Sequence, residues 1–486
     1  MKEIIEINSW IGNQEIRAET YKDDIDPGKN DETVAHVAQG TEETVEQAAL
    51  CAHKAQHAWS ALSLAERRAC IEKMEAVTVG SMSELVELEV REAGHEKRTA
   101  EMDFGIAAES LHYYNTVISD FMKPEVREDA LSRTCIKKVP KGVCGAIIPW
   151  NMPICLTMTK LPLALLTGNT MIVKPPSEAP AALTLLLQRY AKVLPDGVLN
   201  VVNGRGSTIG RAMCDHPLVR KISFTGGTDG GIDVNTHCAQ HLKPATLELG
   251  GNDAAIVLED ADISRVIPQM LHGIFDRAGQ ICFAIKRIYV PRRNFDRFYE
   301  EMCEAVNELT VGYGLHPGAY YGALMNQGQY DQLKSLIEET KKSGAAEVRE
   351  LGSCVTPELW NRGYYVRPHV IKAFSNELSI VQKEQFGPAI PIVPYDTEEE
   401  AVALANGTRF GLGSSVWSAS EEHAIQIANR IEAGQTFING HNLSSLHFGI
   451  PFGGVKDSGI GREFADGLSL NAYVDYHTVR LIKPTN

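Results

Sequence analysis

The sequence lacks several features that would assign it to particular classes of protein. Its apolar runs, such as 161–166, are far shorter than the roughly 20 residues that a membrane-spanning helix needs. No two of its ten cysteines lie closer together than eight residues, so there is no C-x-x-C pair of the kind that binds zinc or transfers electrons. The first ten residues, MKEIIEINSW, contain no apolar segment typical of a secretory signal. We therefore expect a cytoplasmic protein with reduced cysteines, no membrane contact and no metal site.

Positive charge is also scarce. The chain carries 62 acidic and 47 basic residues, which gives a formal net charge of −15. A negative surface repels phosphate backbones, so nucleic acid is not an expected partner. The 486 residues, 44% hydrophobic and 22% charged, are typical of a soluble globular enzyme. This length exceeds the size at which a single core stops growing, and we expect two or three domains.

Helix and strand patterns alternate along most of the chain. Residues 41–118 read as helical, with Ser63 and Ser81 placed to cap successive helices. The stretch 135–150, CIKKVPKGVCGAIIPW, reads as paired strands, after which short β-rich runs alternate with helical segments. A second alternating block follows LELGGND (247–253), whose paired glycines permit a sharp turn between domains. This alternation predicts an α/β fold with two doubly wound domains.

Two glycine-rich turns indicate a dinucleotide. Gly204, Gly206 and Gly210 follow a strand and open a helix, in a G-x-G-x-x-x-G pattern that is one residue longer than the usual fingerprint. A second turn, 226–231, stands between another apolar strand and helix. Either turn alone is as well explained by an ordinary strand-to-helix connection, but two in one parallel sheet favour a dinucleotide. Lys174 closes a strand where it could reach a ribose or phosphate.

Seven stretches, in their order along the chain, resemble those of the aldehyde dehydrogenase superfamily. They are PWNMP (149–153), IVKPPSEAP (172–180), SFTGGT (223–228), LELGGND (247–253), GQICFA (279–284), EQFGP (384–388) and PFGGVKDSGIGRE (451–463). The resemblance covers nearly the whole chain and implies a Rossmann-like cofactor domain, a catalytic domain and a small β arm for oligomerisation. It assigns 1–117 and 141–250 to the dinucleotide-binding domain, 251–450 to the catalytic domain, and 118–140 and 467–486 to the arm and tail.

The resemblance gives one of the ten cysteines a chemical role. On composition alone, Cys282 is better explained as a small apolar core residue than as a nucleophile. By family match its thiolate attacks an aldehyde, while the Asn151 side-chain amide and the Cys282 N–H hold the oxyanion and Glu248 activates water. Singly, Asn151 reads as a turn residue and Glu248 as an ion-paired carboxylate, but at family spacing the catalytic interpretation prevails. Lys160 is expected in a proton path from Glu248, with Asp475, a shorter acid, where the family often has a glutamate.

A nicotinamide dinucleotide is the cofactor that the resemblance implies. Many NAD-preferring members have a glutamate three residues after the strand-end lysine, whereas this chain has Ser177 three residues after Lys174, followed by Glu178. A carboxylate repels the 2′-phosphate of NADP and a serine does not, so we expect NAD to be used and NADP also to be accepted. The match assigns cofactor contacts to Ile148, Pro149, Trp150, Lys174, Ser177, Gly204, Gly206, Phe224, Gly226, Gly227, Leu249, Glu384 and Phe386.

The expected substrate tunnel is mainly apolar and includes no arginine that would bind a carboxylate. This composition indicates an uncharged aliphatic or aromatic aldehyde, although each residue could equally serve in packing. The runs 132–140 and 471–486 resemble the family's arm and tail, which pair across subunits, so we expect a homodimer or homotetramer. The tunnel residues are Met152, Leu156, Thr159, Ile281, Phe283, His447 and Phe448.

Three other functions stay open at this point. A CoA-acylating semialdehyde dehydrogenase would keep the cysteine but typically lacks the glutamate, so Glu248 argues against it. A thiol hydrolase or esterase would need no dinucleotide, and the two glycine turns argue against that. A catalytically silent structural or binding relative is disfavoured by the intact Cys282, Glu248 and Asn151, although only an assay excludes it.

Overall fold

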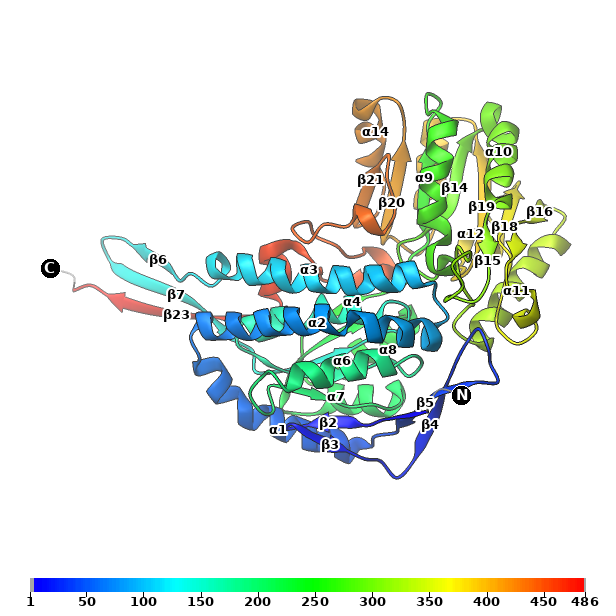
Figure 1. Cartoon of the computed structure of the whole chain (residues 1–486). Coiled ribbons are helices and arrows are strands. Elements are labelled where there is room, and N and C mark those ends of the chain that lie inside the picture. The colour runs from blue at the N-terminus through cyan, green and yellow to red at the C-terminus, as the bar shows by residue number, and fades with distance from the viewer. Residues whose placement is uncertain (1–3, 485–486) are drawn as a thin grey trace.

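Two β-sheets form the framework of the chain, which a computed structural model describes over residues 4–484 (Figure 1). The remaining positions, 1–3 and 485–486, lie outside the described residues, and the last two belong to the predicted tail. Both sheets are built from parallel strands with helices between them, so the predicted α/β fold is confirmed.

The first sheet has a parallel core of five strands in the order β10-β9-β8-β11-β12. Strands β9 and β10 therefore lie on one side of β8. The chain then crosses over, and β11 and β12 lie on the other side of β8. In such sheets, ligands bind beyond the carboxyl ends of the strands where the order reverses. Antiparallel strands β22, β2 and β3 complete the edges. The strands are β2 (Ser9–Ile11), β3 (Gln14–Ile16), β8 (Val143–Ile147), β9 (Thr170–Lys174), β10 (Leu199–Val201), β11 (Val219–Thr225), β12 (Ala245–Glu248) and β22 (Gly459–Ile460).

The second sheet has the order β16-β18-β19-β14-β13-β20-β21, and all but β16 run parallel. It stands beside the first sheet as a separate layer (Figure 1). The chain passes from one to the other through the short segment between β12 and β13, which contains the paired glycines of LELGGND. The strands are β13 (Asp253–Val257), β14 (Ile285–Pro291), β16 (Ala346–Glu350), β18 (His369–Ala373), β19 (Ala389–Tyr395), β20 (Gly413–Trp417) and β21 (Gln435–Ile438).

Helices cover both sheets. No helix of the described chain is long and apolar enough to cross a membrane. Around the first sheet lie α1 (Glu42–Ala61), α2 (Leu64–Ala93), α3 (Lys97–Phe121), α4 (Pro153–Met158), α5 (Leu161–Leu166), α6 (Ala181–Ala191), α7 (Arg211–Asp215) and α8 (Thr228–Gln240). With the second sheet lie α9 (Ile263–Phe275), α10 (Phe295–Asn307), α11 (Gln327–Lys342), α12 (Ser379–Gln382), α13 (Glu398–Asn406) and α14 (Glu421–Ala428).

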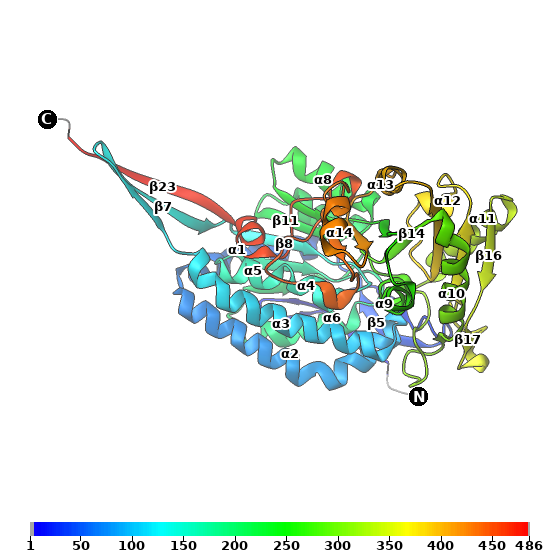
Figure 2. The same cartoon turned by 90° about the horizontal axis from the view of Figure 1, so that it is seen from above.

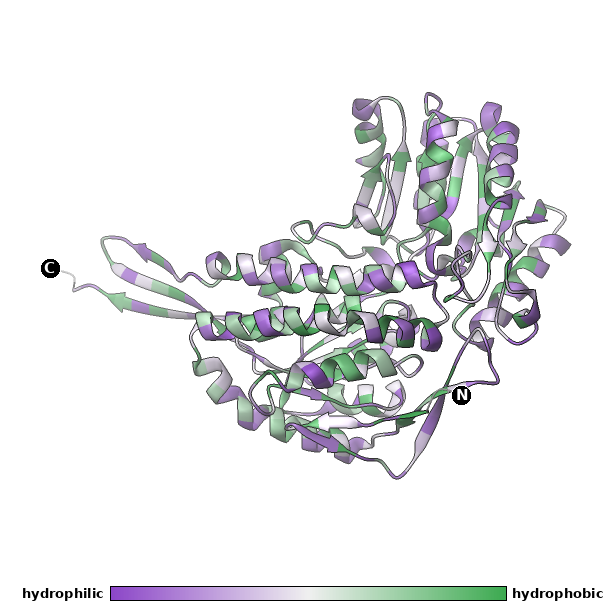
Figure 3. Ribbon diagram, in the orientation of Figure 1, coloured by the Kyte–Doolittle hydropathy of each residue, from purple (hydrophilic) through white to green (hydrophobic). Residues whose placement is uncertain are grey.

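The interior consists of separate apolar cores on the faces of the two sheets. One core packs α2, α3, α5 and α6 onto the first sheet. Another packs onto the second sheet the helices that lie with it, and this sheet and its helices form the second lobe. Figure 3 shows apolar residues along the strands and a mixture of apolar and polar residues along the helices that cover them. Because these helix faces are buried against the sheet, the carboxyl ends of β8, β11 and β12 are held in fixed positions.

One helix replaces the two that the sequence suggested between 63 and 93. Ser63 caps α2 as predicted, because its hydroxyl accepts from Glu66 N and the Glu66 carboxylate accepts from Ser63 N. Ser81 is instead a buried residue inside the same helix, so its prediction as a second cap is wrong. The helix ends at Gly94, whose φ of 72° is the left-handed conformation that glycine adopts easily.

A three-stranded arm projects from the body, away from the second sheet (Figure 2). It consists of β6 (Glu125–Glu128), β7 (Ser132–Pro140) and β23 (Val474–Ile482). The prediction that 135–150 forms paired strands is wrong, because β7 pairs with β6 and β23 while β8 enters the first sheet. The two strands are joined by only a short turn, and local sequence carries no signal that they separate into different sheets.

Buried acids fix the loop between β9 and α6, which carries Ser177. The Glu92 carboxylate accepts from Ala181 N at 2.6 Å and Ala182 N at 2.8 Å, at the start of α6. Asp24, on β4 (Tyr21–Ile25), accepts from Ala179 N at 3.3 Å. Burial raises the pKa of Asp24 to about 7 and that of Glu92 well above its usual range. Because β4 supplies one of these anchors, the N-terminal region helps to place this loop. Strand β4 pairs with β5 (Thr33–Ala38), which also pairs with β1 (Ile5–Ile7).

Candidate active site

A cavity of about 210 Å³ lies at the reversal of the first sheet, beyond the ends of β8 and β11. It brings together nine of the residues predicted from the sequence to contact cofactor or substrate. Four further lining residues were not predicted: Thr225, Gly250, Gln329 and Gln332. The nine are Pro149, Trp150, Asn151, Gly226, Gly227, Leu249, Cys282, Glu384 and Phe386.

The loop that carries Cys282 is held in an unusual backbone conformation. Immediately after α9, Arg277, Ala278 and Gly279 adopt φ values of 53°, 55° and 73°, all in the left-handed region. Two non-glycine residues in this region store strain, which the surrounding contacts must offset. The loop then presents Cys282 to the cavity.

Charge and burial both act on the Cys282 thiol. Burial raises the pKa of Cys282 above its ordinary value. The nearby carboxylates of Asp253, Glu384 and Glu248 raise this pKa further. A nucleophile in this position therefore needs positive charge or a base to become a thiolate.

Asn151 is tied to the nucleophile loop through two bonds. Its side-chain Nδ2 donates to Gln280 O at 3.0 Å, and its own carbonyl accepts from Arg277 Nη1 at 2.5 Å. An amide nitrogen has two N–H groups, so Asn151 keeps a second donor for another acceptor. Asn151 thus lines the same cavity as Cys282 and has one side-chain N–H left for another acceptor.

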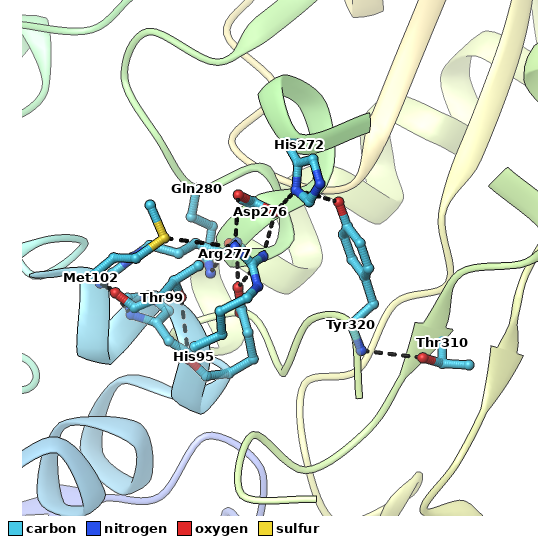
Figure 4. Close-up of polar contacts among 11 residues, drawn as sticks. His95, Thr99, Met102, His272, Asp276, Arg277, Gln280, Thr310 and Tyr320 are labelled. Atoms are coloured by element: carbon cyan, nitrogen blue, oxygen red, sulfur yellow. Dashed lines mark hydrogen bonds and ion pairs between the residues drawn. The ribbon is translucent and has the colours of Figure 1, made fainter. Parts of the chain in front are cut away.

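Arg277 is the centre of a buried polar network that sequence reasoning missed (Figure 4). Its guanidinium binds groups on the preceding helices as well as Asn151, so it joins the nucleophile loop to α2 and α3. Asp103, one of the carboxylates that pair with Arg277, accepts from Cys155 N at the start of α4. This bond extends the network to the segment after Asn151. The other partners of Arg277 are His95 Nδ1 at 2.7 Å, Thr99 O at 2.6 Å, and the carboxylates of Glu89 and Asp103 at 3.4 and 3.6 Å.

Asp276, which precedes Arg277 in the sequence, belongs to the part of the network that lies nearest the surface. Its buried carboxylate pairs with Arg98 at 2.6 Å and with His272 at 3.2 Å. His272 stacks on Tyr320, with ring centroids 5.8 Å apart. The Tyr320 hydroxyl also lies 3.1 Å from His272 Nδ1, a contact drawn in Figure 4. The Asp276 hydrogen bond raises the pKa of His272. These contacts fix the end of α9 from which the nucleophile loop begins.

Glu248 ends β12 as a buried carboxylate with neither oxygen hydrogen-bonded among the described residues. Burial raises its pKa well above the ordinary value, Glu463 raises it further and Lys160 lowers it. Gly453 closes over it, since a Cβ at that position would lie 2.5 Å from Glu248 Oε1. A carboxylate held this way has a high proton affinity and free lone pairs, which suits a general base.

Lys160 bonds to Glu463, a residue that the sequence reasoning did not single out. Lys160 Nζ lies 2.6 Å from Glu463 Oε1, and both side chains are almost fully buried. Thr159, predicted as a tunnel residue, donates to Glu463 Oε2 at 2.7 Å. Asp475 instead lies on the exposed arm, where it pairs with Lys141. The acid next to Lys160 is therefore Glu463, which closes the quoted stretch PFGGVKDSGIGRE.

The second glycine turn suits a phosphate. A Cβ at Gly226 would lie 2.6 Å from the Phe224 ring, so only glycine fits there. Gly227 caps α8 without a side-chain bond, and a Cβ at this position would meet nothing within 4 Å. The first N–H groups of α8 are thus open to an anion. Leu249 packs against the same helix at Gly231.

A separate group of predicted cofactor residues meets at the ends of β9 and β10. Lys174 Nζ donates to Ser177 Oγ at 3.0 Å, and Ser177 Oγ donates to Gly204 O at 3.3 Å. Burial lowers the pKa of Lys174 to about 8. Ile148 N donates to Lys174 O at 3.1 Å, while Gly206 opens the exposed turn that leads into α7. With the cavity, these groups fit an extended dinucleotide better than a small ligand.

Glu178, the acid that follows Ser177, forms an ion pair with Lys22. Lys22 Nζ lies 2.6 Å from Glu178 Oε1 and donates to Ser177 O at 3.2 Å. Both charged side chains are more than one-third exposed, so the pair is partly screened by water. The Glu178 carboxylate is nevertheless engaged by an N-terminal lysine far away in sequence, and its charge beside Ser177 is balanced.

Glu384 and Phe386 stand on the opposite side of the cavity. Glu384 Oε1 accepts from Gly251 N at 3.1 Å, and burial raises its pKa to about 7. The Phe386 ring meets Trp150 edge-on, with centroids 5.5 Å apart. Both predicted residues therefore line the cavity from the side of the second sheet.

Cys282 belongs to a hydrophobic cluster that contains several aromatic side chains. The predicted residues Met152, Leu156, Ile281, Phe283 and Phe448 belong to it. His447 is exposed and lies at its edge, with its ring 6.5 Å from that of Tyr113. Members that the sequence did not reveal come from α3 and from the C-terminal loops: Met102, Ile106, Tyr113, Phe452 and Phe464. Within residues 4–484, no cluster of three or more His, Cys, Asp or Glu side chains is arranged to hold a metal ion.

Comparison with known proteins places this site in context. The family model described as the aldehyde dehydrogenase family matches residues 10–479. Geranial dehydrogenase of Castellaniella defragrans is 38% identical over 376 residues, which cover 76% of each chain. An aldehyde dehydrogenase of Bacillus cereus, solved as an NAD⁺ complex, superposes with a TM-score of 0.92 at 30% identity, covering 98% of this chain and 96% of that one. An NADP-dependent enzyme of Escherichia coli superposes with a TM-score of 0.93 at 27% identity, covering 98% of both chains.

The Arg277 network predicts a large stability difference between two arginine variants. Arg277→Met leaves the buried Glu89 and Asp103 carboxylates without their cation, which costs about 3–5 kcal/mol for a buried pair. Arg349→Met removes an exposed pair with Glu300 and should cost no more than about 1 kcal/mol. Urea titration measures both free energies of unfolding. Equal losses would contradict the role given to Arg277.

Proposed function

The chain belongs to the aldehyde dehydrogenase family, and we propose that it oxidises an uncharged aldehyde to the carboxylic acid, with a nicotinamide dinucleotide as hydride acceptor. The observation that carries this proposal is that Cys282 and Asn151 line one cavity, while the Glu248 carboxylate, buried without a hydrogen-bond partner among the described residues, acts electrostatically on Cys282. Addition to the aldehyde needs the thiol and the amide donor, and hydrolysis of the resulting thioester needs the free base.

In the first half of the reaction, the Cys282 thiolate bonds to the carbonyl carbon and the carbonyl oxygen becomes an oxyanion. The second N–H of the Asn151 side chain and the Cys282 N–H donate to this oxygen, and this stabilisation favours the addition. When bound, the nicotinamide ring accepts the hydride that leaves the substrate carbon. The acyl group is then held on Cys282 as a thioester.

In the second half, Glu248 removes a proton from water as the water oxygen attacks the thioester carbon. The carbon–sulfur bond breaks, the acid leaves and Cys282 is restored. A raised proton affinity suits this step, because Glu248 must accept a proton and later release it. The Lys160–Glu463 pair next to Glu248 offers a route for that proton, in place of the predicted Asp475.

We infer the substrate class from the apolar cluster that includes Cys282. Its members are apolar or aromatic, with Tyr113 hydrogen-bonded to Asp466 at one side. Such surroundings favour an aldehyde with a hydrocarbon body over one with a charged end. The relative named geranial dehydrogenase supports the same class.

The two halves of the reaction predict different results for two variants. Glu248→Gln should release one equivalent of reduced cofactor in a rapid burst and then stall, because hydride transfer precedes deacylation. Cys282→Ala should give neither burst nor turnover. Stopped-flow absorbance of the reduced nicotinamide follows both phases, and Asp475→Asn serves as the acidic control with normal turnover. Full steady-state turnover by Glu248→Gln would show that another group activates water. Lost turnover with a thiol acceptor restoring it would instead favour the CoA-acylating alternative.

Cofactor choice is proposed from the surroundings of Ser177. A 2′-phosphate there meets a hydroxyl and the Lys174 ammonium, while Lys22 offsets the Glu178 charge. We propose that NAD is used and that NADP is accepted within roughly tenfold, a difference of about 1.4 kcal/mol. Ser177→Glu should shift the ratio of kcat/KM values toward NAD, and Lys22→Met should shift it the same way by releasing Glu178. A wild-type enzyme that rejects NADP, with neither variant altering the ratio, would show that Ser177 does not face the ribose.

The arm supports an oligomer. Strand β23 exposes Val479, Leu481 and Ile482, each more than half accessible, on a ribbon that leaves the body. Exposed apolar strands are aggregation hazards unless a partner covers them. We propose a homodimer or a dimer of dimers, and light scattering should give the corresponding mass. Val479→Asp should lower that mass, whereas a monomer mass for the wild type at micromolar concentration would contradict the proposal.

A further inference from the structure

Lys286 is a buried lysine for which the mechanism above has no use. It is the second residue of β14 and is almost completely inaccessible. Its ammonium donates to Gly279 O at 2.5 Å, on the loop that carries Cys282. It also lies 3.4 Å from Gln385 O and 5.0 Å from the centroid of the Phe386 ring, on the loop that carries Glu384. One ammonium therefore joins the nucleophile loop to the cofactor loop.

This position is costly for a lysine. No carboxylate among residues 4–484 forms an ion pair with Lys286, and its partners are carbonyl dipoles and an aromatic face. Burial lowers its pKa to about 8, so near neutral pH the ammonium form still predominates. An apolar side chain of similar length would avoid the cost of burying the charge. The charge itself is therefore the feature to explain.

The neighbouring charges are mainly negative. Asp253 at the start of β13, Glu384 on the cofactor loop and Glu248 at the end of β12 all disfavour the Cys282 thiolate. The Asp253 carboxylate accepts from Gly413 N at 3.0 Å and lies 3.4 Å from His441 Nε2. Lys286 is electrostatically coupled to Glu384, Asp253 and Cys282, and its charge has the sign that a thiolate needs.

We propose that Lys286 is a positioning residue whose ammonium stabilises the Cys282 thiolate while it holds the nucleophile loop against the cofactor loop. The inference rests on the proposed role of Cys282 as nucleophile. Deprotonation of Cys282 leaves a negative charge in a site from which water is largely excluded, where a nearby positive charge acts with little screening. The proton leaves to a neighbouring carboxylate or to solvent, and no other reactant is needed.

A second buried lysine provides a matched control. Lys221, on β11, is equally inaccessible, donates to Thr246 Oγ1 at 2.8 Å and lies 4.7 Å from the Tyr473 ring centroid. Burial lowers its pKa to about 8 as well. Its contacts are with Ile222, Thr246 and Tyr473, and they include no residue of the loop that carries Cys282. Lys221→Met thus removes the same charge in a similar setting without touching Cys282.

The test measures thiolate formation without any aldehyde or cofactor. Iodoacetamide alkylates only the thiolate, whose sulfur displaces iodide to form a thioether, and peptide mass mapping reports the reaction at Cys282. The alkylation rate is measured from pH 6 to 10.5 for the full-length wild type and for Lys286→Met, Lys286→Gln and Lys221→Met. Below pH 8, where the Lys286 ammonium predominates, removing it should lower the alkylation rate about tenfold, and at pH 10.5, where Lys286 is neutral in the wild type, the rates should converge. Lys221→Met should reproduce the wild-type profile.

Lys286→Gln separates charge from hydrogen bonding. Its amide can still donate to Gly279 O, so it should lower the alkylation rate below pH 8 as Lys286→Met does only if the charge acts on the thiol. A wild-type profile for Lys286→Gln, or for both variants, would overturn the inference, as would an equal loss of rate in Lys221→Met. If Lys286→Met does not fold, Lys286→Gln alone decides. Aldehyde turnover by the wild type and its loss in Cys282→Ala test the proposed function separately, so either idea can fail without the other.

Discussion

Exclusion of water from the charged groups around Cys282 is the constraint on which the rest of the site depends. Five charged side chains of this region are buried: Lys160, Glu463, Glu248, Arg277 and Lys286. In such surroundings a paired charge is held firmly and an unpaired one is strongly destabilising. The ion pairs of Lys160 with Glu463 and of Arg277 with its two acids offset most of this cost. Among the described residues, Glu248 and Lys286 have no ion-pair partner, and Glu248 is the group for which a high proton affinity is useful.

The second requirement is geometric, and the sheet topology meets it. The first sheet reverses its order between β8 and β11, and the segments that follow these strands carry Asn151 and the second glycine turn. Strand β12 supplies Glu248 at the same edge. The second lobe delivers Cys282 and Glu384 to the cavity from the opposite side. Each group stands at an element end that packed helices hold in place, so the arrangement needs little reorganisation before reaction.

The sequence predicted the α/β class, the family and nine of the thirteen residues that line the cavity, because motifs such as LELGGND and GQICFA each occupy a strand end or a turn. It did not predict Glu463, although the stretch that contains it was noted, because nothing local shows that residue 463 meets residue 160. The same limit applies to Arg277 and Asn151, which are 126 positions apart, and to Lys22 and Glu178, which are 156 apart. Asp475 was chosen by sequence position alone, and it lies on the arm. Contacts of this kind depend on tertiary packing, and periodicity carries no record of them.

The most direct test of the account is to find where the acyl group resides during turnover. Wild-type enzyme mixed with excess apolar aldehyde and cofactor is quenched in acid within milliseconds, and its peptides are mapped by mass spectrometry. The account predicts an acyl adduct on the peptide that contains Cys282, bound through a linkage that hydroxylamine cleaves. An adduct on a different cysteine, or continued turnover with no adduct on any peptide, would contradict it.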